Sequence, residues 1–331
     1  MASGGAEIMK RSATTLLAIA VLLIGEPSLA GPIAVEATPA PLDPRDPGAL
    51  RAGKLKYRGG VVLKSADQHF GGFSGLGVSA DGKRMIAVSD RGRRLAADVV
   101  YGADGNLTGL ANTSLDTLAD LEGRPLTRKM FSDAESMSPG VEGEIIIGFE
   151  RAHRLWRYMP GEVTPRPLKT PDEAAALPAN SGIEALTLLA DGSLFAIAEG
   201  SDDDNESLAW VSDTGGWSVM TYALKDGFRA TGAATLPGGD VLVLERRYTL
   251  RTGVAARVRR LAANAITPGT HLEAELIAEL RPPGTVDNME GIEVRRAETG
   301  PDAGKTLVYL VSDDNFNPLQ RTLLMMFELM D

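Results

Sequence analysis

The sequence predicts an all-β protein folded as a single β-propeller, and three observations support this fold class. Short apolar runs flank turn dipeptides such as Asp191-Gly192, a pattern typical of β-hairpins. This hairpin pattern occurs five times at steps of about 50 residues, which is the period of a propeller blade. The apolar runs are also nearly continuous, as expected for strands that are buried on both faces.

Five blades can be counted along the chain. Their inner hairpins are expected at residues 73–90, 134–150, 183–199, 230–245 and 289–313. Material for two outer strands follows these hairpins, and four strands per repeat make a blade. Six blades are also compatible with the sequence, because the long stretch of residues 94–131 has room for one more.

The amino terminus has the pattern of a secretory signal peptide. Lys10 and Arg11 precede an apolar run at residues 16–24, and residues 28–30 form the small-x-small pattern of a signal peptidase site. The apolar run is much shorter than the ~20 residues that a membrane span needs. We therefore expect residues 1–30 to be removed, leaving a periplasmic or secreted protein without a membrane span.

The segment between the signal and the first blade is expected to be flexible. Residues 31–52 are rich in proline and lack apolar periodicity, which is typical of a weakly ordered leader. The propeller domain then occupies residues 53–331. A strand near residues 57–63 is expected to pair with residues 322–329, because this pairing closes the ring and removes its free edges.

Composition limits the classes of partner. The formal net charge of −10 and a pI near 5.0 do not fit a nucleic-acid-binding protein, which needs a basic surface. The chain has no cysteine, so neither a disulfide framework nor a lipid-modified cysteine can form. We expect a monomer whose partner is a small anionic molecule or ester.

The hairpin turns place carboxylates opposite each other. With two-residue turns, Glu184 lies opposite Glu199 in the third hairpin and Glu135 lies opposite Glu150 in the second. Directly opposed Cβ atoms are about 5 Å apart. Two carboxylates at this distance repel by about 3 kcal/mol at an effective dielectric constant of about 20. Such repulsion has to be compensated.

The same end of every hairpin lies at one mouth of a propeller, so further acids should converge on the axis. The fifth hairpin adds Glu290 and Asp313, and the first adds Asp90. An arginine directly follows Asp90, Glu150 and the fourth hairpin's Glu245 along the chain, and these arginines are Arg91, Arg151 and Arg246. Because successive strand residues point to opposite faces, each arginine is expected to pair with an acid of a neighbouring blade.

Three kinds of compensation are compatible with this pattern: a ring of inter-blade salt bridges, a bound hard cation such as Ca²⁺, or shared protons. The candidate cation ligands are the converging carboxylates Glu135, Glu150, Glu184, Glu290 and Asp313. The candidate substrate-binding residues are Asp90, Arg91, Arg151 and Arg246. Glu184 or Glu199 is the candidate general base toward water, and no organic cofactor is expected.

Five separated segments resemble an exported bacterial family called "esterase-like activity of phytase". They are FGGFSGLGVSADGKRMIAVSDRGR (70–93), GIEAL (182–186), FRATGAATLPGGDVLVLERRY (228–248), VDNMEGIEV (286–294) and VSDDNFNPLQRTLL (311–324). The resemblance spans residues 54–329 and implies a propeller that hydrolyses an ester or a phosphoester.

Three functions are compatible with the sequence. The first is a metal-assisted esterase or phosphoesterase that acts on an anionic ester at the mouth. The second is a non-catalytic propeller that binds a ligand or a partner there. The third is a sugar-lactone hydrolase with one axial cation, an expectation that rests on fold analogy alone.

Overall fold

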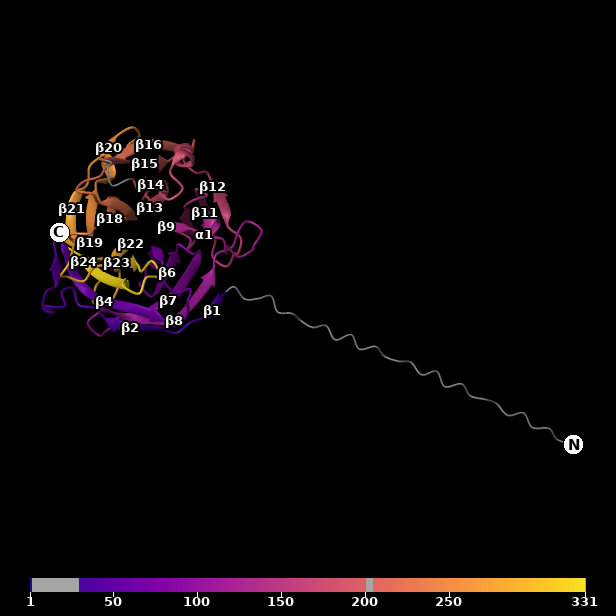
Figure 1. Ribbon diagram of the computed structural model, residues 1–331, viewed down its shortest axis with the longest axis horizontal. Helices are drawn as coiled ribbons and strands as arrows, with labels where there is room; N and C mark the ends of the chain where they lie inside the picture. Colours follow the sequence, from indigo (N-terminus) through magenta and orange to yellow (C-terminus); the bar gives the residue numbers. More distant parts are fainter. Residues whose placement is uncertain (2–29, 201–204, 331) are drawn as a thin grey trace.

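The computed structural model describes residue 1, residues 30–200 and residues 205–330. The chain forms five antiparallel blades around a central axis, and the inner strands β9, β13 and β22 lie at the centre while β2, β12 and β20 lie at the rim (Figure 1). The propeller fold and the count of five blades are confirmed. The predicted signal peptide lies almost entirely outside the described residues.

From the axis outward, blade 1 consists of β5 (Phe73–Val78), β6 (Arg84–Ser89), β7 (Arg93–Tyr101), β8 (Leu107–Thr117) and β1 (Ala30–Pro32). In the same direction, blade 2 consists of β9 (Ala134–Pro139), β10 (Ile145–Phe149), β11 (Arg154–Tyr158) and β12 (Arg166–Leu168). Blade 3 consists of β13 (Ile183–Leu188), β14 (Leu194–Ala198), β15 (Glu206–Ser212), β16 (Trp217–Ala223) and β20 (His271–Leu272).

Blade 4 consists of β17 (Arg229–Thr235), β18 (Val241–Thr249), β19 (Gly253–Leu261) and β21 (Glu275–Leu280). Blade 5 consists of β22 (Asn288–Arg296), β23 (Thr306–Asp313), β24 (Thr322–Leu329), β4 (Leu55–Ser65) and β2 (Val35–Pro39), with β3 (Arg51–Ala52) paired to β4. The helical elements are α1 (Lys129–Ser132) and the 3₁₀ turns η1 (Asp172–Ala176) and η2 (Ala263–Ala265). No helix among the described residues is long and apolar enough to cross a membrane.

An amino-terminal strand closes the ring as predicted. β4 pairs with β24, so blade 5 combines strands from both ends of the chain. The expectation of a flexible leader at residues 31–52 is wrong, because β2 adds to β4 in blade 5 and β1 adds to β8 in blade 1. This segment therefore spans the junction between blades 1 and 5 and covers two strand edges that would otherwise be open.

The core lies between the blades. Among the described residues, the buried apolar side chains form five clusters, and each cluster joins two neighbouring blades. The second strands β6, β10, β14, β18 and β23 contribute to both of their flanking clusters, which explains why β10 and β14 are buried along their whole length. Continuous apolar runs in the sequence follow from this burial on both faces.

The registers of the second and third hairpins differ from the prediction by one residue. The third hairpin is closed by a three-residue loop at 190–192, where the Leu189 backbone N–H donates to the Ser193 carbonyl at 2.8 Å. Gly192 in this loop has φ +86°, a conformation that favours glycine. Glu184 is consequently not opposite Glu199, and Glu135 is not opposite Glu150.

A β-bulge interrupts the first strand of every inner hairpin. The residue that the bulge leaves unpaired is Ser74, Glu135, Glu184, Thr231 or Glu290 in blades 1 to 5, respectively. These are the five positions that the repeat spacing makes equivalent. A bulge re-aims its side chain at the end of a strand, and bulges are common next to functional sites.

The inner strands approach one another too closely for large side chains directly after the bulge. The residues at that position are Gly75, Ser136, Ala185, Gly232 and Gly291. A Cβ atom on Gly232 would lie 2.8 Å from the Glu290 carbonyl oxygen of the next blade. The small side chains thus permit five strands to meet around one axis.

We predict that Gly232→Ala lowers the free energy of unfolding by about 1–3 kcal/mol, because the new methyl group overpacks the interface between blades 4 and 5. Chemical denaturation measures this change. Gly238→Ala is the matched control in the same blade, since no atom lies within 4 Å of its new Cβ. Equal stabilities of the two variants would contradict the close approach of the inner strands.

Candidate functional site

A cavity of about 930 Å³ opens at the mouth where the bulged ends of the inner strands meet. Its walls include every carboxylate expected at the mouth and two of the three expected arginines. The expected residues that line it are Asp90, Glu135, Glu150, Arg151, Glu184, Glu199, Arg246, Glu290 and Asp313. The predicted convergence of acids on one mouth is therefore present in the fold.

Arg91 does not line this cavity. Its guanidinium lies over the ring of Phe316, 3.3 Å from the ring centroid, and the side chain is exposed. Cation–π stacking thus fixes Arg91 beside the loop between β23 and β24. Arg91 is therefore not among the residues that would contact a ligand in the cavity.

Each blade presents three equivalent positions at the mouth. The first is the bulge residue, and the second is the residue two positions before it in the sequence. The third lies on the second strand of the hairpin, opposite that second residue. In blade 2 all three positions are acidic, namely Asp133, Glu135 and Glu150. In blade 4 two are basic, Arg229 and Arg246, and the bulge residue is Thr231. The same positions are thus acidic in blade 2 and mainly basic in blade 4, the two blades that flank blade 3.

The basic side of the mouth is internally compensated. Arg246 bridges two neighbouring blades, with Nε 2.7 Å from Glu290 Oε1 and a terminal nitrogen 3.4 Å from Glu199 Oε1. Arg229 also lies 2.9 Å from Glu199 Oε1. Inter-blade salt bridges therefore form an arc across blades 3, 4 and 5. Of the predicted arginines, Arg246 takes part in this arc, whereas Arg151 pairs with Asp133 of its own blade.

The acidic side, in blade 2, contains a compact group of carboxylates. One oxygen from each of Asp133, Glu135 and Glu150 lies within 4.8 Å of the other two. Asp133 is fully buried and accepts hydrogen bonds from Arg151 Nε at 2.5 Å and from Lys129 Nζ. α1 carries Lys129 to this position. Two cationic groups thus stabilise the deepest acid of the group.

Two further carboxylates lack such partners. Glu150 and Glu184 are more than nine-tenths buried, and among the described residues neither side chain has a hydrogen-bond or ion-pair partner. Glu290 Oε2 is likewise buried without a hydrogen-bond partner in the described part of the chain. Buried carboxylate oxygens without a partner are rare in folded proteins and indicate a site for a proton or a cation.

Burial is the main cause of the altered acidity at the mouth. Desolvation, together with neighbouring carboxylates, raises the pKa of Glu150 and of Glu290 to about 7. The same causes raise the pKa of Asp313 to about 8. The pKa values of Glu135 and Glu184 are raised well above the ordinary value, first by burial and then by neighbouring carboxylates. Proton sharing is thus compatible with the site alongside a cation.

An apolar layer below the acids contributes to this desolvation. Apolar side chains of the inner strands enclose a small cavity of about 10 Å³ that also touches Glu184 and Glu290. These apolar residues are Leu76, Met137, Leu186, Ala233 and Ile292. The axis is therefore narrow and apolar directly under the carboxylates, and this lower dielectric disfavours their charged forms.

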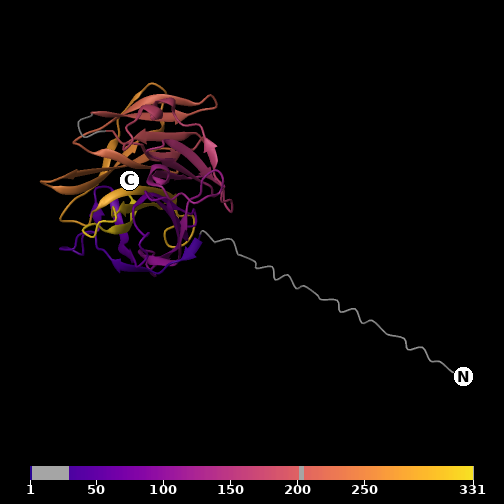
Figure 2. The ribbon, with the colours of Figure 1, turned by 45° about the vertical axis from the view of Figure 1, so that its right-hand side comes forward.

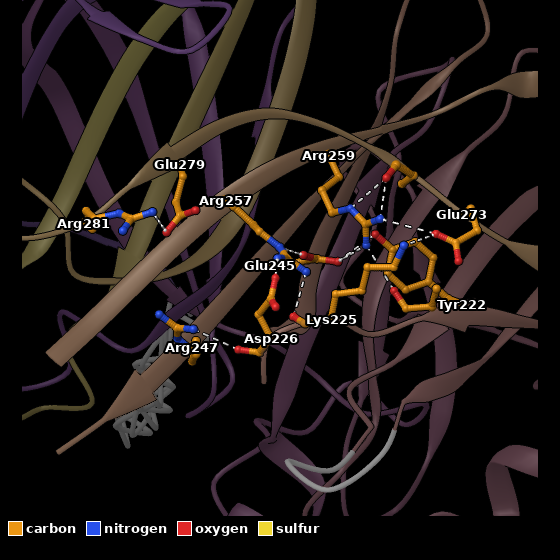
Figure 3. Close-up of polar contacts among 12 residues, drawn as sticks. Tyr222, Lys225, Asp226, Glu245, Arg247, Arg257, Arg259, Glu273, Glu279 and Arg281 are labelled. Atoms are coloured by element: carbon orange, nitrogen blue, oxygen red, sulfur yellow. Dashed lines mark hydrogen bonds and ion pairs between the residues drawn. The ribbon is translucent and has the colours of Figure 1, made fainter. Parts of the chain in front are cut away.

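Blade 4 differs from the other blades because its acid, Glu245, points into the protein interior and not into the cavity at the mouth. Figure 3 shows Glu245 among Arg257, Arg259 and Tyr222, and Glu245 is not one of the residues that line the cavity at the mouth. The Tyr222 hydroxyl donates to Glu245 Oε1 at 2.8 Å, and Arg259 lies 3.3 Å from the same oxygen. Arg257 Nε also donates to this fully buried carboxylate. Glu245 therefore joins β18 to β19 within blade 4 and to β16 of blade 3, and the next residue, Arg246, turns to the mouth.

Several residues at the mouth were not expected from the sequence. Asp133, Lys129 and Arg229 supply charge next to the predicted acids, while Asp287 and Arg321 pair at the rim with 3.2 Å between Arg321 Nε and Asp287 Oδ2. Asp133 and Arg229 occupy the same position in their repeats, two residues before the bulge. Aligning the repeats on the bulge would have identified these two residues.

We predict that the unfolding free energy of cation-free protein falls as pH rises from about 4 to about 8. Acids with raised pKa bind more protons in the folded state than in the unfolded state over this window, so deprotonation favours unfolding. Asp313, with its pKa near 8, contributes to this slope. Chemical denaturation across this pH range after dialysis against a chelator gives the measurement.

The variant Asp313→Asn should have a shallower slope, because it removes one of the titrating groups. Asp98→Asn is the control, since Asp98 lies on the exposed part of β7 away from the mouth. A stability that rises with pH over the same window would contradict this account.

The fold and the mouth together define a class: a single-domain, five-bladed propeller with a cavity of mixed charge at one end of its axis. The family described as "Phytase-like: Esterase-like activity of phytase" matches residues 68–316, and the chain belongs to this family. The family relation supports a propeller of hydrolase type. No curated protein matches the sequence significantly.

Several solved structures are similar to this chain over most of its length, at low sequence identity and with low TM-scores. Virginiamycin B lyase from Staphylococcus aureus is 10% identical with a TM-score of 0.41, over 88% of this chain and 99% of that one. A luciferin-regenerating enzyme is 10% identical with a TM-score of 0.39, over 78% and 92% of the two chains. The Cps50 (Swd1) propeller domain of Myceliophteria thermophila is 11% identical with a TM-score of 0.40, over 90% and 99%.

Proposed function

We propose that this protein is an exported, divalent-cation-dependent hydrolase of an anionic carboxyl ester or phosphoester, acting in the cavity at the mouth of the propeller. The observation that carries this proposal is that acidic and basic residues lie on different sides of the mouth. Glu135 and Glu150 of blade 2 and Arg246 of blade 4 line the same cavity, which Glu184 of blade 3, the blade between them, also lines. Such a cavity can hold a cation and an anion side by side.

The acidic group fits a hard cation such as Ca²⁺. Oxygen ligands of Ca²⁺ lie about 2.3–2.6 Å from the ion, so two ligands of one ion are at most about 5 Å apart. The oxygens of Asp133, Glu135 and Glu150 meet this condition, and the unpartnered Glu184 lies beside them. A cation held there would polarise the ester oxygen and lower the pKa of a bound water.

Glu290 and Asp313, which were also expected as ligands, have other partners. Glu290 is paired with Arg246, and Asp313 accepts a hydrogen bond from the Asn315 backbone at 2.6 Å. Both residues lie in blade 5, which does not adjoin blade 2. We therefore assign the cation to Asp133, Glu135 and Glu150, which meet the distance condition, and leave Glu184 beside it free to act on water.

The arginines of the cavity would hold the anionic part of the substrate. Arg246 is partly exposed, and Arg151 and Arg321 are more exposed, so each can direct N–H groups into the cavity in addition to its ion pair. Guanidinium groups bind carboxylate or phosphate through paired hydrogen bonds. Asp90, which pairs with Lys129 at 2.9 Å, keeps this lysine directed at the mouth.

Glu184 is the better placed of the two candidate bases. Glu199 Oε1 is held in ion pairs with Arg229 and Arg246, so this carboxylate is engaged in positioning the two arginines. Glu184 has no such partner, and burial together with neighbouring carboxylates raises its pKa, so its carboxylate is a stronger base than that of an ordinary glutamate. We therefore propose that Glu184 is the general base and that Glu199 positions Arg229 and Arg246.

We predict that hydrolysis of 4-nitrophenyl phosphate or 4-nitrophenyl acetate by this protein requires a divalent cation and is lost after chelation. Glu135→Gln should lower both bound calcium and activity, because it removes a ligand. Glu184→Gln should lower activity by about 10²–10⁴-fold, the usual contribution of a general base. Calcium content by elemental analysis and initial rates are the measurements.

Glu142→Gln is the matched control for these variants, because Glu142 is an exposed acid in the turn at the other end of the blade 2 hairpin. It should leave calcium content and rates unchanged. The proposal is wrong if Glu184→Gln alters neither calcium content nor hydrolysis. A lactone panel run in parallel identifies the sugar-lactone alternative.

We predict that the exported protein begins at Gly31, since cleavage after Ala30 removes only the first residue of β1 and leaves β2 and every blade intact. Intact-mass analysis of protein recovered from the periplasm or the medium tests this. Recovery of a chain that retains residues 1–30, or of cell-internal protein alone, would contradict export.

A further inference from the structure

We propose that the substrate of this cavity carries an apolar group, aromatic or alkyl, which packs against Tyr248 and Leu319 while its anionic group contacts the arginines of the mouth. This inference rests on the proposed function in one respect, that an anion binds in the cavity. It adds the chemical class of the remainder of the substrate.

One wall of the cavity is apolar, in contrast to the charged floor. Tyr248, Val254, Val286 and Leu319 line it together with the acids and arginines. Tyr248 is 65% exposed and Leu319 is 90% exposed. Large apolar side chains left exposed beside a polar cavity are typical of ligand-contacting surfaces, because a ligand can cover the area that the protein does not bury.

Tyr248 belongs to a hairpin whose strands are longer than their counterparts in blades 2 and 3. β18 and β19 have nine residues each, whereas β10 and β14 have five. The extra length lies beyond Arg246, so the hairpin rises above the mouth; Figure 2 shows it in orange, extending past the neighbouring strands. Tyr248 is paired with Val254 across the two strands, and both line the cavity. The hairpin thus forms one apolar side of the entrance.

Leu319 is exposed on an ordered loop. Its backbone N–H donates to Asn317 Oδ1 at 3.0 Å, and Gln320 N–H donates to the Asn317 carbonyl at 2.9 Å. Arg321 fixes the end of the loop through Asp287 and through the Val286 carbonyl at 2.9 Å. The loop therefore holds Leu319 at the entrance in a defined position, at little ordering cost when a ligand binds.

The distribution of charge beside this wall sets the orientation of the substrate. Arg246 and Arg321 lie on the blade 4 and blade 5 side, which is also the side of Tyr248 and Leu319. The acids of blade 2 belong to a blade that adjoins neither. An anionic group bound by the arginines therefore has its apolar substituent directed at the hairpin and the loop, and its reacting ester directed at Glu184.

The test compares two non-hydrolysable anions that differ only in their apolar part, phenylphosphonate and methylphosphonate. Calorimetric titration of the full calcium-loaded protein should show about tenfold tighter binding of phenylphosphonate, from burial of the ring against the apolar wall. Tyr248→Ala and Leu319→Ala should each reduce this preference while leaving the affinity for methylphosphonate unchanged. Val141→Ala, an exposed apolar residue in the turn between β9 and β10, is the control and should keep the preference.

Equal affinity of the unaltered protein for the two phosphonates would overturn the inference. A preference that persists in both variants would overturn the assignment to Tyr248 and Leu319. Binding of neither anion would overturn the arginine site together with this inference. A clear preference in a protein that hydrolyses no ester would support this inference and reject the proposed reaction, so the two can fail separately.

Discussion

Burial of carboxylates above a narrow apolar axis is the constraint on which the mouth of this propeller depends. Five inner strands meet so closely that glycine, alanine or serine must follow each bulge, and larger apolar residues fill the axis below. A bulge residue in this position loses most of its contact with water. Where that residue is Glu135, Glu184 or Glu290, the charged form is disfavoured and its pKa rises. The negative charge of a carboxylate in this cavity therefore has to be compensated by a neighbouring side chain, a proton or a ligand.

The blades compensate the buried carboxylates in different ways. This difference makes one side of the mouth basic and the other side acidic. Blade 4 replaces acids by Arg229 and Arg246, which compensate Glu199 and Glu290 in the adjoining blades. Its remaining acid, Glu245, is turned inward and paired with two buried arginines. Blade 2 keeps three acids, and in the described part of the chain the ion pairs of this group are made by Asp133. One side of the mouth is thus neutralised by the protein, and the other side is suited to a cation.

The fold could be predicted in detail because its signals are local. Turn glycines and continuous apolar runs define the hairpins, and their spacing gives the number of blades. The closing pair of β4 and β24 was also predictable, since an unpaired edge strand at each end of the chain has one obvious partner. The role of residues 31–52 was not predictable, because β1 and β2 are short, rich in proline, and become strands only when an edge of blade 1 or blade 5 is already present.

The sequence by itself determined which residues reach the mouth. Repeat spacing places Glu135, Glu184 and Glu290 at equivalent points, and hairpin ends of all blades meet at one end of the axis. Only the tertiary structure decided what each side chain does there. Bulges and three-residue loops moved the acids out of direct opposition. Contacts between blades paired Arg246 with Glu290 and stacked Arg91 on the ring of Phe316, outside the cavity. The physical reason is that a side chain's charge state and partner depend on desolvation and on neighbours from other blades, which are distant in sequence.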